Sequence, residues 1–331
     1  MGIAESIDTV LDRTVVMGYG SPGYRIRSWL PTWPADPPRC DGKVVLVTGA
    51  GSGIGLAAAA GFAALGASVR VLGRDAQRAE QAATLTRRRA TELGHSSEDG
   101  LDVRPVACDV SSLRELRDFV DRFTAEESRL DVLVNNAGVM PGERQHTVDG
   151  VELTFATHVL APFVLIEGLA PLLRAGAPSR VVNVTSGGQY GQAIPQDLES
   201  EDSKYSPKKI YARTKREQLA ITELWAQRLA GSDIHVHAMH PGWADTAGVR
   251  RWMPVFRALT RPIIRNPEQG ADTIVWLGCA PEAIRTTGLF WHDRRPRPTI
   301  YRVGAHQDDE LIRQRLWDHV ADLAQRRGIR H

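Results

Sequence analysis

The sequence predicts a doubly wound α/β fold of the Rossmann type, with a mainly parallel, seven-stranded sheet and helices on both faces. Short runs of β-branched residues alternate with longer helical patterns, which is typical of repeated βαβ units. A glycine-rich turn joins the first of these runs to a helical stretch, as in dinucleotide-binding folds. The 331 residues suit one α/β domain of about 250 to 300 residues with additions at its ends.

Seven short runs rich in valine, isoleucine and leucine supply the predicted strands. They are Val44 to Val47, Val69 to Leu72, Val103 to Cys108, Val132 to Val134, Val181 to Val184, Ile234 to Met239 and Leu289 to Trp291. Helical patterns fill most of the intervals between them. We therefore expect one Rossmann-type domain over residues 41–304.

Residues 1–40 differ in amino-acid composition from the rest of the chain. Gly-Tyr-Gly-Ser-Pro-Gly at 18–23 and Trp-Pro-Ala-Asp-Pro-Pro at 33–38 are turn and linker chemistry. Tyr24, Trp29 and Trp33 are available as anchors. This composition predicts an N-terminal extension outside the sheet.

The C-terminal residues 305–331 predict an amphipathic helix. Its apolar positions approximate a helical stripe made of Leu311, Ile312, Leu316, Trp317, Val320 and Leu323. Such a stripe packs either on the same chain or on another subunit, and we favour the same chain.

Charge and cysteine content exclude several classes of protein. Lys and Arg total 41 against 39 acidic residues, a balance too even for the phosphate attraction of nucleic-acid binders. Cys40, Cys108 and Cys279 are widely scattered, which argues against a disulfide framework or zinc cluster and favours a reducing compartment.

Membrane-spanning and secretion patterns are both missing from the sequence. No run approaches the roughly 18 apolar residues that a membrane span needs, and the N-terminus lacks a basic stretch followed by a hydrophobic one. We expect a cytoplasmic protein, with a peripheral position at a membrane as the alternative.

The first chemical motif is the glycine-rich turn after Val44 to Val47. Glycines let the backbone approach a pyrophosphate closely while the amides and dipole of the next helix meet its charge. The G-x-G-x-x-G pattern fails at Ile54, and Thr-Gly-x-x-x-Gly-x-Gly stands in its place. The predicted cofactor-binding residues here are Thr48, Gly49, Gly51, Ser52, Gly53, Ile54 and Gly55.

A second motif, Tyr211-Ala-Arg-Thr-Lys215, predicts the chemistry of the site. Residues four apart share a helix face, so both side chains would enter one cleft. An ammonium group beside a phenol favours phenolate and lowers the tyrosine pKa toward the range of a general acid/base. Ser186, at a strand end, can hydrogen-bond a substrate oxygen as charge develops on it.

The order of these motifs resembles the short-chain dehydrogenase/reductase family over about Asp41 to Arg294, and its dehydrogenase/reductase member twelve branch in particular. Asn135-Asn136-Ala137-Gly138 and Pro241-Gly242 also fall in the family order. The resemblance implies a further set of cofactor contacts, to which Tyr211 and Lys215 also belong. These are Asp109, Val110, Asn136, Ala137, Gly138, Pro241, Gly242 and Thr246.

Cofactor choice rests on the end of the second predicted strand. The acidic residue of NAD users in the family matches Gly73, and Arg74, which can pair with a 2′-phosphate, follows it. This favours NADP(H) over NAD(H). Asp75 is the rival contact, but we prefer it as the N-cap of the next helix. Asp109 and Asn136 also have structural readings, as a helix cap and a turn residue.

One position departs from the family. His158 stands where an asparagine usually helps to hold a water of the proton relay. A neutral imidazole has one donor and one acceptor and can replace the amide, but its shape and titration differ. The alternative is a structural histidine with the relay rerouted.

Residues 243–265 predict a substrate lid. Trp243, Val249, Trp252, Met253, Val255, Phe256 and Leu259 supply apolar surface suited to a greasy carbonyl compound or alcohol. The same stretch contains Arg250, Arg251, Arg257, Arg261 and Arg265. We rank a solvated basic face first, contact with anionic lipid second and recognition of an anionic substrate tail third.

His235, His237 and His240 do not predict a metal site, because no cysteine or carboxylate cluster completes it. We expect a strand face packed against helices, and hydride chemistry requires no metal.

Together these features predict an NADP(H)-dependent oxidoreductase that acts on an apolar ketone, aldehyde or secondary alcohol. A catalytically weak NADP-binding sensor or scaffold of the same fold is the alternative. The resemblance also implies a homodimer or homotetramer paired through helices near residues 151–174 and 207–230.

Overall fold

The structure is a computed structural model that describes residues 2–94, 100–201, 204–245, 254–301 and 308–326. Its centre is one sheet with the strand order β3-β2-β1-β4-β5-β6-β7-β8. The strands are β1 (Val44–Thr48), β2 (Ser68–Gly73), β3 (Val103–Ala107), β4 (Val132–Asn135), β5 (Ser179–Val184), β6 (Ile234–Met239), β7 (Phe290–His292) and β8 (Arg295–Arg297).

The predicted fold class is confirmed, and within the described residues the strand count is corrected from seven to eight. All seven predicted runs form strands in parallel register, and β8 adds an antiparallel edge to β7. No pattern indicated β8, because Arg-Pro-Arg lacks β-branched residues and proline is tolerated only at a sheet edge.

The strand order reverses between β1 and β4, which creates a topological switch point. β2 and β3 lie on one side of β1, whereas β4 to β8 continue on the other. Open α/β sheets bind ligands at the carboxyl ends of the strands at such a point. This edge of the sheet is therefore where the site is built.

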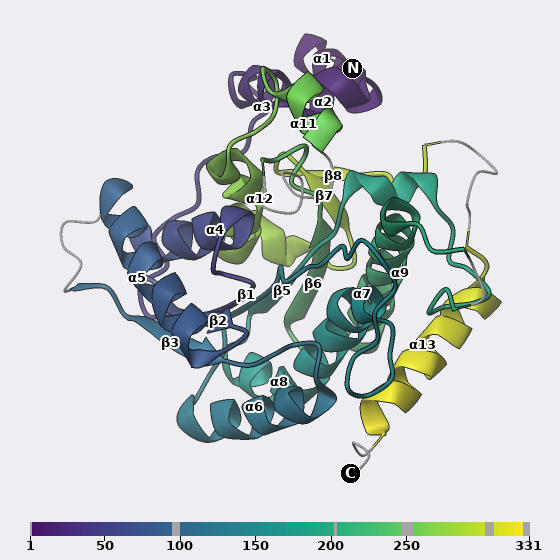
Figure 1. Cartoon of the computed structure of the whole chain (residues 1–331). Coiled ribbons are helices and arrows are strands. Elements are labelled where there is room, and N and C mark those ends of the chain that lie inside the picture. Colours follow the sequence, from purple (N-terminus) through teal and green to yellow (C-terminus); the bar gives the residue numbers. More distant parts are fainter. Residues whose placement is uncertain (1, 95–99, 202–203, 246–253, 302–307, 327–331) are drawn as a thin grey trace.

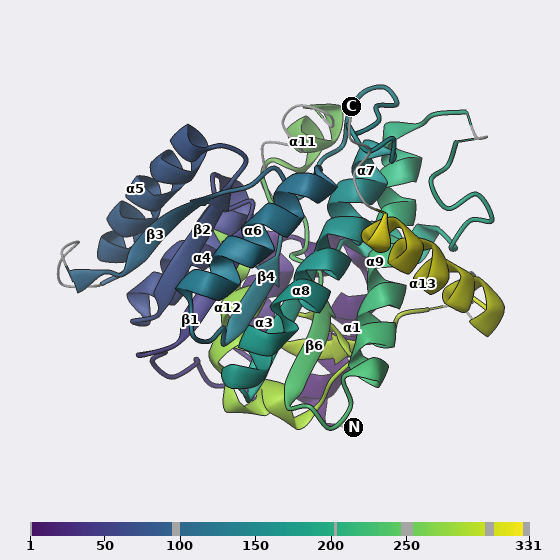
Figure 2. The ribbon, with the colours of Figure 1, turned by 90° about the horizontal axis from the view of Figure 1, so that it is seen from below.

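Helices cover both faces of the sheet. One face carries α4 (Gly53–Ala64), α5 (Ala76–Glu92) and α12 (Pro267–Cys279), and the other carries α6 (Leu113–Glu126), α8 (Ala161–Ala175) and α9 (Pro207–Arg228) (Figures 1 and 2). Two separate apolar cores result, one on each face. Shorter helical segments between the strands and these helices are α7 (Leu153–Phe155), η2 (Ala156–Leu160), η3 (Gly187–Gly191), α11 (Pro254–Thr260) and η4 (Pro281–Arg285).

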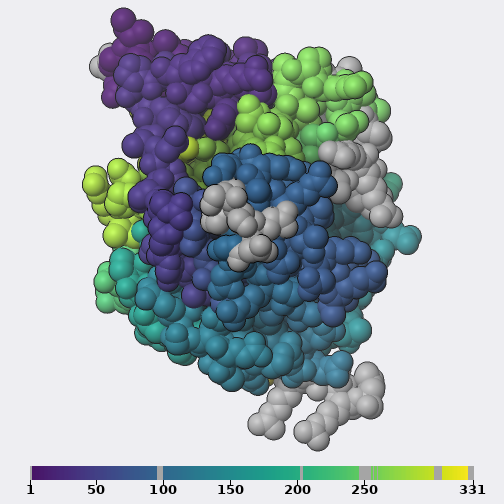
Figure 3. Space-filling model, turned by 90° about the vertical axis from the view of Figure 1, so that its left-hand side faces the viewer, coloured from purple at the N-terminus to yellow at the C-terminus, as the bar shows by residue number. Residues whose placement is uncertain are grey.

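The N-terminal extension lies outside the sheet but is helical rather than linker-like over most of its length. It forms α1 (Ile3–Arg13), α2 (Val15–Tyr19) and α3 (Ser21–Ser28) at one end of the molecule, next to α11 (Figure 1). Figure 3 shows the extension and the green segment that contains α11 forming that end together. The glycines at 18 and 23 reflect close helix packing, because a Cβ at Gly18 would lie 1.9 Å from the carbonyl oxygen of Leu11.

A buried arginine–aspartate cluster anchors the extension to the sheet. It consists of Asp8, Arg27, Arg265, Asp293 and Arg297, all 9% exposed or less. Arg27 donates to Asp8 and to Asp293, at 2.8 and 2.6 Å, and Arg297 donates to both oxygens of Asp8 at 2.8 Å. Burial raises the pKa of Asp8, but the hydrogen bond and charge of Arg297, with Arg27 and Arg295, outweigh it and hold the pKa at about 2.

The cysteine prediction is wrong for two of the three residues. Cys40 and Cys279 form a disulfide across 239 residues of sequence, whereas Cys108 is a buried free thiol. The pair joins the chain just before β1 to the end of α12. The spacing of the cysteines in the sequence did not indicate this disulfide, because only the fold brings two such distant residues together.

The C-terminal helix α13 (Glu310–Gln325) packs on its own chain, as we expected. Ile312, Leu316, Val320 and Leu323 are buried in the core of α8 and α9. Trp317 contacts the rings of Phe163 and Trp225 at centroid distances of 4.8 and 4.9 Å. Leu311 does not belong to the buried stripe, since it is 82% exposed. Figure 2 shows α13 lying along α9.

One stretch is more apolar than the sequence-based expectation of no membrane-length run. Residues 153–175, which run through α7, η2 and α8, are long and apolar enough to cross a membrane. However, 83% of the apolar window is buried inside the fold. The hydropathy of this segment reflects its place in the core, where nearly all its faces meet other elements.

Candidate active site

The glycine-rich turn has the backbone geometry that a pyrophosphate cradle requires. Gly49 and Gly53 have φ of +66° and +55°. A Cβ at Gly55 would lie 2.4 Å from the carbonyl oxygen of Gly49, so this close approach needs glycine. Gly51 and Ser52 are exposed, and the side chain of the N-cap residue Ser52 does not cap α4. The turn and the helix N-terminus therefore fit the phosphates of a dinucleotide. Ile54 is largely buried in the core beneath.

The turns after β1 and β4 are joined into one unit by Thr48 and Asn136. The hydroxyl of Thr48 accepts hydrogen bonds from the backbone amides of Asn136 and Ala137, both at 3.0 Å. The side-chain amide of Asn136 donates to the carbonyl oxygens of Thr48 and Gly49 at 3.0 and 3.3 Å. Asn136 thus shapes this turn, as its structural reading expected, at the switch point itself.

Arg74 and Asp109 face each other beyond the ends of β2 and β3. Arg74 Nε lies 3.6 Å from Asp109 Oδ2, and the Arg74 side chain is 55% exposed. Asp109 accepts from the amide and hydroxyl of Ser111, so it shapes the turn before α6, and Val110 is half-buried beside it. The N-cap of α6 is Ser112.

The two neighbours of Arg74, Gly73 and Asp75, each have a structural role. A Cβ at Gly73 would lie 2.5 Å from the backbone nitrogen of Ala79, so an acidic side chain at this position would clash with α5. Asp75 accepts a hydrogen bond from the amide of Arg78 at 2.8 Å and caps α5, which confirms the preferred reading.

Tyr211, Lys215 and Ser186 converge at the carboxyl end of β5. Lys215 Nζ donates to the carbonyl oxygen of Val184 at 2.8 Å and to Gln218 Oε1 at 3.0 Å. It lies 5.8 Å from the centroid of the Tyr211 ring. Ser186 Oγ accepts from the amide of Gly188 at 3.1 Å, and its side chain hydrogen-bonds Tyr211.

Burial controls the titration of this group. It lowers the pKa of Lys215 to about 7 and raises the pKa of Tyr211, which the hydrogen bond with Ser186 opposes. The prediction that Lys215 lowers the pKa of Tyr211 is therefore wrong for the protein without its dinucleotide. The amine is itself desolvated and directs its hydrogen bonds to Val184 and Gln218.

His158 lies in a π-helical turn, η2, and is fully buried beside the Tyr211 ring, with the two centroids 5.3 Å apart. Its Nε2 accepts from the amide of Val139 at 3.0 Å, so Nδ1 carries the proton and donates to Thr214 Oγ1 at 2.8 Å. Thr214 in turn donates to the backbone oxygen of Tyr211 at 3.0 Å. Burial and the charge of Lys215 hold the pKa of His158 well below its usual range.

This arrangement matches the alternative in which His158 is a structural histidine, since both ring nitrogens already have protein partners. Thr214 is a further residue of the site that the sequence did not predict. It lies inside the Tyr-x-x-x-Lys motif, but its link to His158 depends on packing between α9 and η2. A Cβ at Gly138 would lie 3.2 Å from His158 Nε2, so the turn after β4 also packs on the imidazole.

The N-terminal extension reaches this site through Tyr19, a second residue that the sequence did not predict. A Cβ at Gly187, next to Ser186, would lie 2.6 Å from Cε2 of Tyr19. The Tyr19 ring also lies 4.6 Å from that of His240, between centroids. Because Tyr19 is distant in sequence from both residues, no local pattern could predict these contacts.

The same turn of the extension holds both ends of the predicted lid. The carbonyl oxygen of Tyr19 accepts from the amide of Trp243 at 2.8 Å, and the amide of Ser21 donates to the carbonyl oxygen of Ile263 at 2.7 Å. Gly242 has a φ of +73°, and a Cβ there would lie 2.5 Å from the carbonyl oxygen of Tyr19. Pro241 and Gly242 thus lie at the end of β6 as predicted, whereas Thr246, Val249, Trp252 and Met253 fall outside the described residues.

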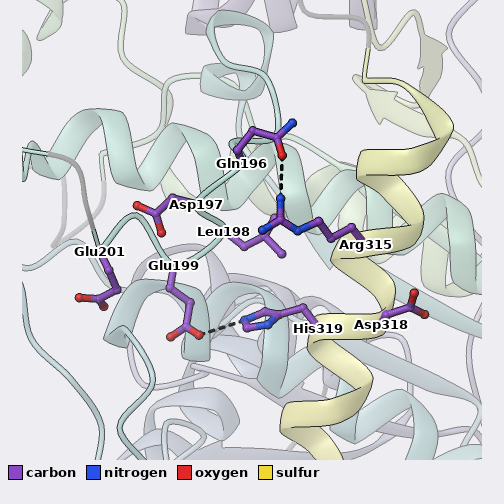
Figure 4. A pocket seen from close by; sticks show the side chains of 8 residues that line it. All are labelled: Gln196, Asp197, Leu198, Glu199, Glu201, Arg315, Asp318 and His319. Carbon is purple, nitrogen blue, oxygen red and sulfur yellow. Dashed lines mark hydrogen bonds and ion pairs between the residues drawn. The ribbon is translucent and has the colours of Figure 1, made fainter.

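A surface pocket lies elsewhere, between α13 and the loop around residues 196–201 (Figure 4). Its volume is about 680 Å³. Charged and polar groups dominate its lining, including His319 and Glu199, which form a hydrogen bond of 2.9 Å. Such a lining does not suit an apolar ligand, and none of the predicted site residues contributes to it.

His237 of β6 and His240, which follows the strand, have protein partners in the described part of the chain. His237 accepts from Trp291 Nε1 at 3.0 Å and, through its other nitrogen, donates to the carbonyl oxygen of Ala283 at 3.0 Å. His240 Nδ1 accepts from the amide of Gly242 at 3.2 Å. Among the described residues, no group of three or more histidines, cysteines and carboxylates is arranged to hold a metal ion.

The fold and this site define an α/β oxidoreductase of the dinucleotide-binding class, with its ligand groups at the switch point of the sheet. Residues 43–254 match the family model for short chain dehydrogenase. The chain belongs to the short-chain dehydrogenase/reductase family, whose members transfer a hydride and bind NAD(P).

Relatives support the same assignment. The chain is 38% identical to dehydrogenase/reductase SDR family member 12 of Bos taurus over 287 residues, which covers 86% of this chain and 87% of that protein. It is 36% identical to retinol dehydrogenase 14 of Mus musculus over 292 residues, 86% of each chain. Among solved structures, the Pseudomonas aeruginosa RhlG/NADP active-site complex matches with a TM-score of 0.61 and 26% identity, over 81% of this chain and 98% of that one.

Proposed function

We propose that this chain is an NADP(H)-dependent oxidoreductase that transfers a hydride between the nicotinamide and an apolar ketone, aldehyde or secondary alcohol. The observation that carries the proposal is the convergence of Ser186, Tyr211 and Lys215 at the carboxyl end of β5, on the same edge of the parallel sheet as the glycine turn after β1. We also propose that residues 243–265 form the lid over the substrate, with the extension holding its two ends.

Each of the three side chains has a distinct role in the proposed reaction. When bound, the dinucleotide supplies the hydride to the carbonyl carbon in the reductive direction. Tyr211 donates its phenolic proton to the carbonyl oxygen, and Ser186 hydrogen-bonds that oxygen as negative charge develops on it. Lys215, whose pKa is about 7, exists in both protonation states near neutral pH and can return a proton toward Tyr211.

The proposed preference for NADP(H) rests on Arg74. Its exposed guanidinium stands at the end of β2, where a 2′-phosphate would replace Asp109 as its partner. The backbone of α5 leaves no room for an acidic side chain at Gly73, the position that would otherwise favour NAD.

Replacing Arg74 with alanine should weaken NADPH binding by about 10 to 100-fold and NADH binding much less, since a charged hydrogen bond contributes roughly 1.5–3 kcal/mol. Fluorescence titration with both cofactors measures the effect. Arg78→Ala is the matched control, because Arg78 is 60% exposed and lies in the first turn of α5. Equal losses for the two cofactors in Arg74→Ala would refute the phosphate contact.

His158 favours one second candidate, a catalytically weak NADP-binding sensor or scaffold. Its two nitrogens are committed to Val139 and Thr214, so the imidazole is not free to bind a relay water. Titration of the purified protein with NADPH, followed by NADPH oxidation with a panel of apolar carbonyl compounds, separates the candidates. Binding with turnover supports the reductase, whereas binding without turnover across the panel supports the sensor.

A His158→Asn substitution is expected to destabilise the protein by about 1–3 kcal/mol, because the shorter amide cannot reach both partners and leaves a buried polar group unpaired. Urea unfolding measures the change. His235→Asn is the control, because His235 is partly exposed where it hydrogen-bonds the carbonyl oxygen of Thr286. Unchanged unfolding of His158→Asn would show that the two hydrogen bonds contribute nothing.

A further inference from the structure

The outward side of the extension is apolar. On α1, Ile3, Ile7 and Val10 are 83%, 37% and 62% exposed. Their spacing of four and three residues places them along one stripe of the helix. The stripe faces water rather than the protein.

The inward side of α1 buries two acids together with Leu11. Asp8 and Asp12 are 4% and 6% exposed, and Arg297 pairs with both. A surface helix of a globular domain ordinarily buries its aliphatic residues and exposes its carboxylates. Here the cluster of buried arginines holds the acidic side, so the aliphatic stripe remains outside.

Neighbouring elements at the same end of the molecule expose further apolar side chains. Val15, Val16 and Met17 of α2 are 47%, 56% and 44% exposed, Trp29 after α3 is 81% exposed and Val255 of α11 is 71% exposed. All these elements gather at one end of the molecule (Figure 1). We call the eight residues of this surface the apolar end face: Ile3, Ile7, Val10, Val15, Val16, Met17, Trp29 and Val255.

The charges on and beside the same elements are mainly basic. Arg13, Arg25 and Arg261 are exposed, and Glu5 is the exposed acid of α1. Aliphatic and tryptophan side chains beside arginines are typical of helices that lie in the interface of an anionic membrane. Two copies of the face would instead bring arginines against arginines, which disfavours self-association.

We propose that the apolar end face docks on the surface of an anionic lipid bilayer. The helices α1 and α2 lie in the interface, the aliphatic side chains enter the acyl boundary and the arginines meet the lipid phosphates. The surface shares Val255 and Arg261 with the basic segment at 250–265, whereas its other seven apolar residues belong to the extension. Docking of this face on a bilayer does not depend on the proposed oxidoreductase activity.

The test is flotation of the full-length chain with vesicles of phosphatidylcholine alone or of phosphatidylcholine with phosphatidylglycerol. We expect binding to the anionic vesicles that weakens as salt is raised, and little binding to the neutral ones. The Ile3→Ser/Val10→Ser variant should bind at least about 10-fold more weakly, because it loses the burial of two aliphatic side chains.

Val148→Ser/Leu311→Ser is the matched control, since Val148 and Leu311 are 84% and 82% exposed on other elements. It should bind as the unchanged protein does, and both variants should unfold at the same urea concentration. Lack of binding to anionic vesicles, or equal losses in the two variants, would overturn the proposal. The proposal would also be overturned if sedimentation showed that the unchanged protein is a dimer and that the Ile3→Ser/Val10→Ser variant is a monomer.

Discussion

Replacing Tyr211 with phenylalanine is expected to lower kcat/KM by about 10²–10⁴-fold, the usual contribution of a general acid/base. The phenolic hydroxyl is the proposed proton donor, and it hydrogen-bonds the side chain of Ser186, the proposed partner of the substrate oxygen. Phenylalanine keeps the ring and its packing on His158 but has no proton to give. NADPH oxidation with the substrate found in the carbonyl panel measures the loss.

The affinity of Tyr211→Phe for NADPH should be nearly unchanged, which separates lost chemistry from lost binding. Tyr205→Phe is the control, because Tyr205 lies just before α9 and donates to the carbonyl oxygen of Pro141 at 2.9 Å. Its turnover should stay close to that of the unchanged protein. Turnover that survives in Tyr211→Phe would remove this residue from the mechanism.

The second large effect is on stability. Asp293→Ala is expected to lower the free energy of unfolding by about 3–5 kcal/mol, because it leaves the buried charges of Arg27 and Arg265 without their shared partner. Asp293 also lies in the turn between β7 and β8 with a φ of +51°. This uncommon backbone conformation for a residue with a side chain is held by its ion pairs.

Urea unfolding measures this change, and Asp41→Ala provides the comparison. Asp41 pairs with Arg39 at 2.7 Å, but the two side chains are 62% and 59% exposed. An exposed pair contributes about 0–1 kcal/mol, so the control should unfold almost as the unchanged protein does. Similar losses in the two variants would mean that burial of the arginine–aspartate cluster has little energetic weight.

The sequence predicted those parts of the fold and site that depend on local patterns. The glycine turn is local because steric demands on Gly49, Gly53 and Gly55 arise within one turn. The pairing of Tyr211 with Lys215 follows from helix periodicity. The mainly parallel sheet with helices on both faces likewise follows from the repeated βαβ units.

The remaining parts depend on residues that are distant in sequence. Tyr19 meets Gly187, and Cys40 meets Cys279, only after the chain has folded. The pKa of Tyr211 was predicted in the wrong direction because spacing shows proximity to Lys215 but not burial. The helices of the extension were missed because buried ion pairs, rather than an apolar stripe, attach them to the domain.

The docking of α13 has a consequence for self-assembly. The family resemblance implies pairing through helices near residues 151–174 and 207–230, and α13 packs on α8 and α9 within these ranges. Because α13 is tethered to the same chain, its effective concentration at α8 and α9 is on the order of millimolar. A second chain in dilute solution does not reach this concentration. The C-terminal helix covers part of α8 and α9, so an oligomer that used the same surfaces of these helices would require α13 to be displaced first.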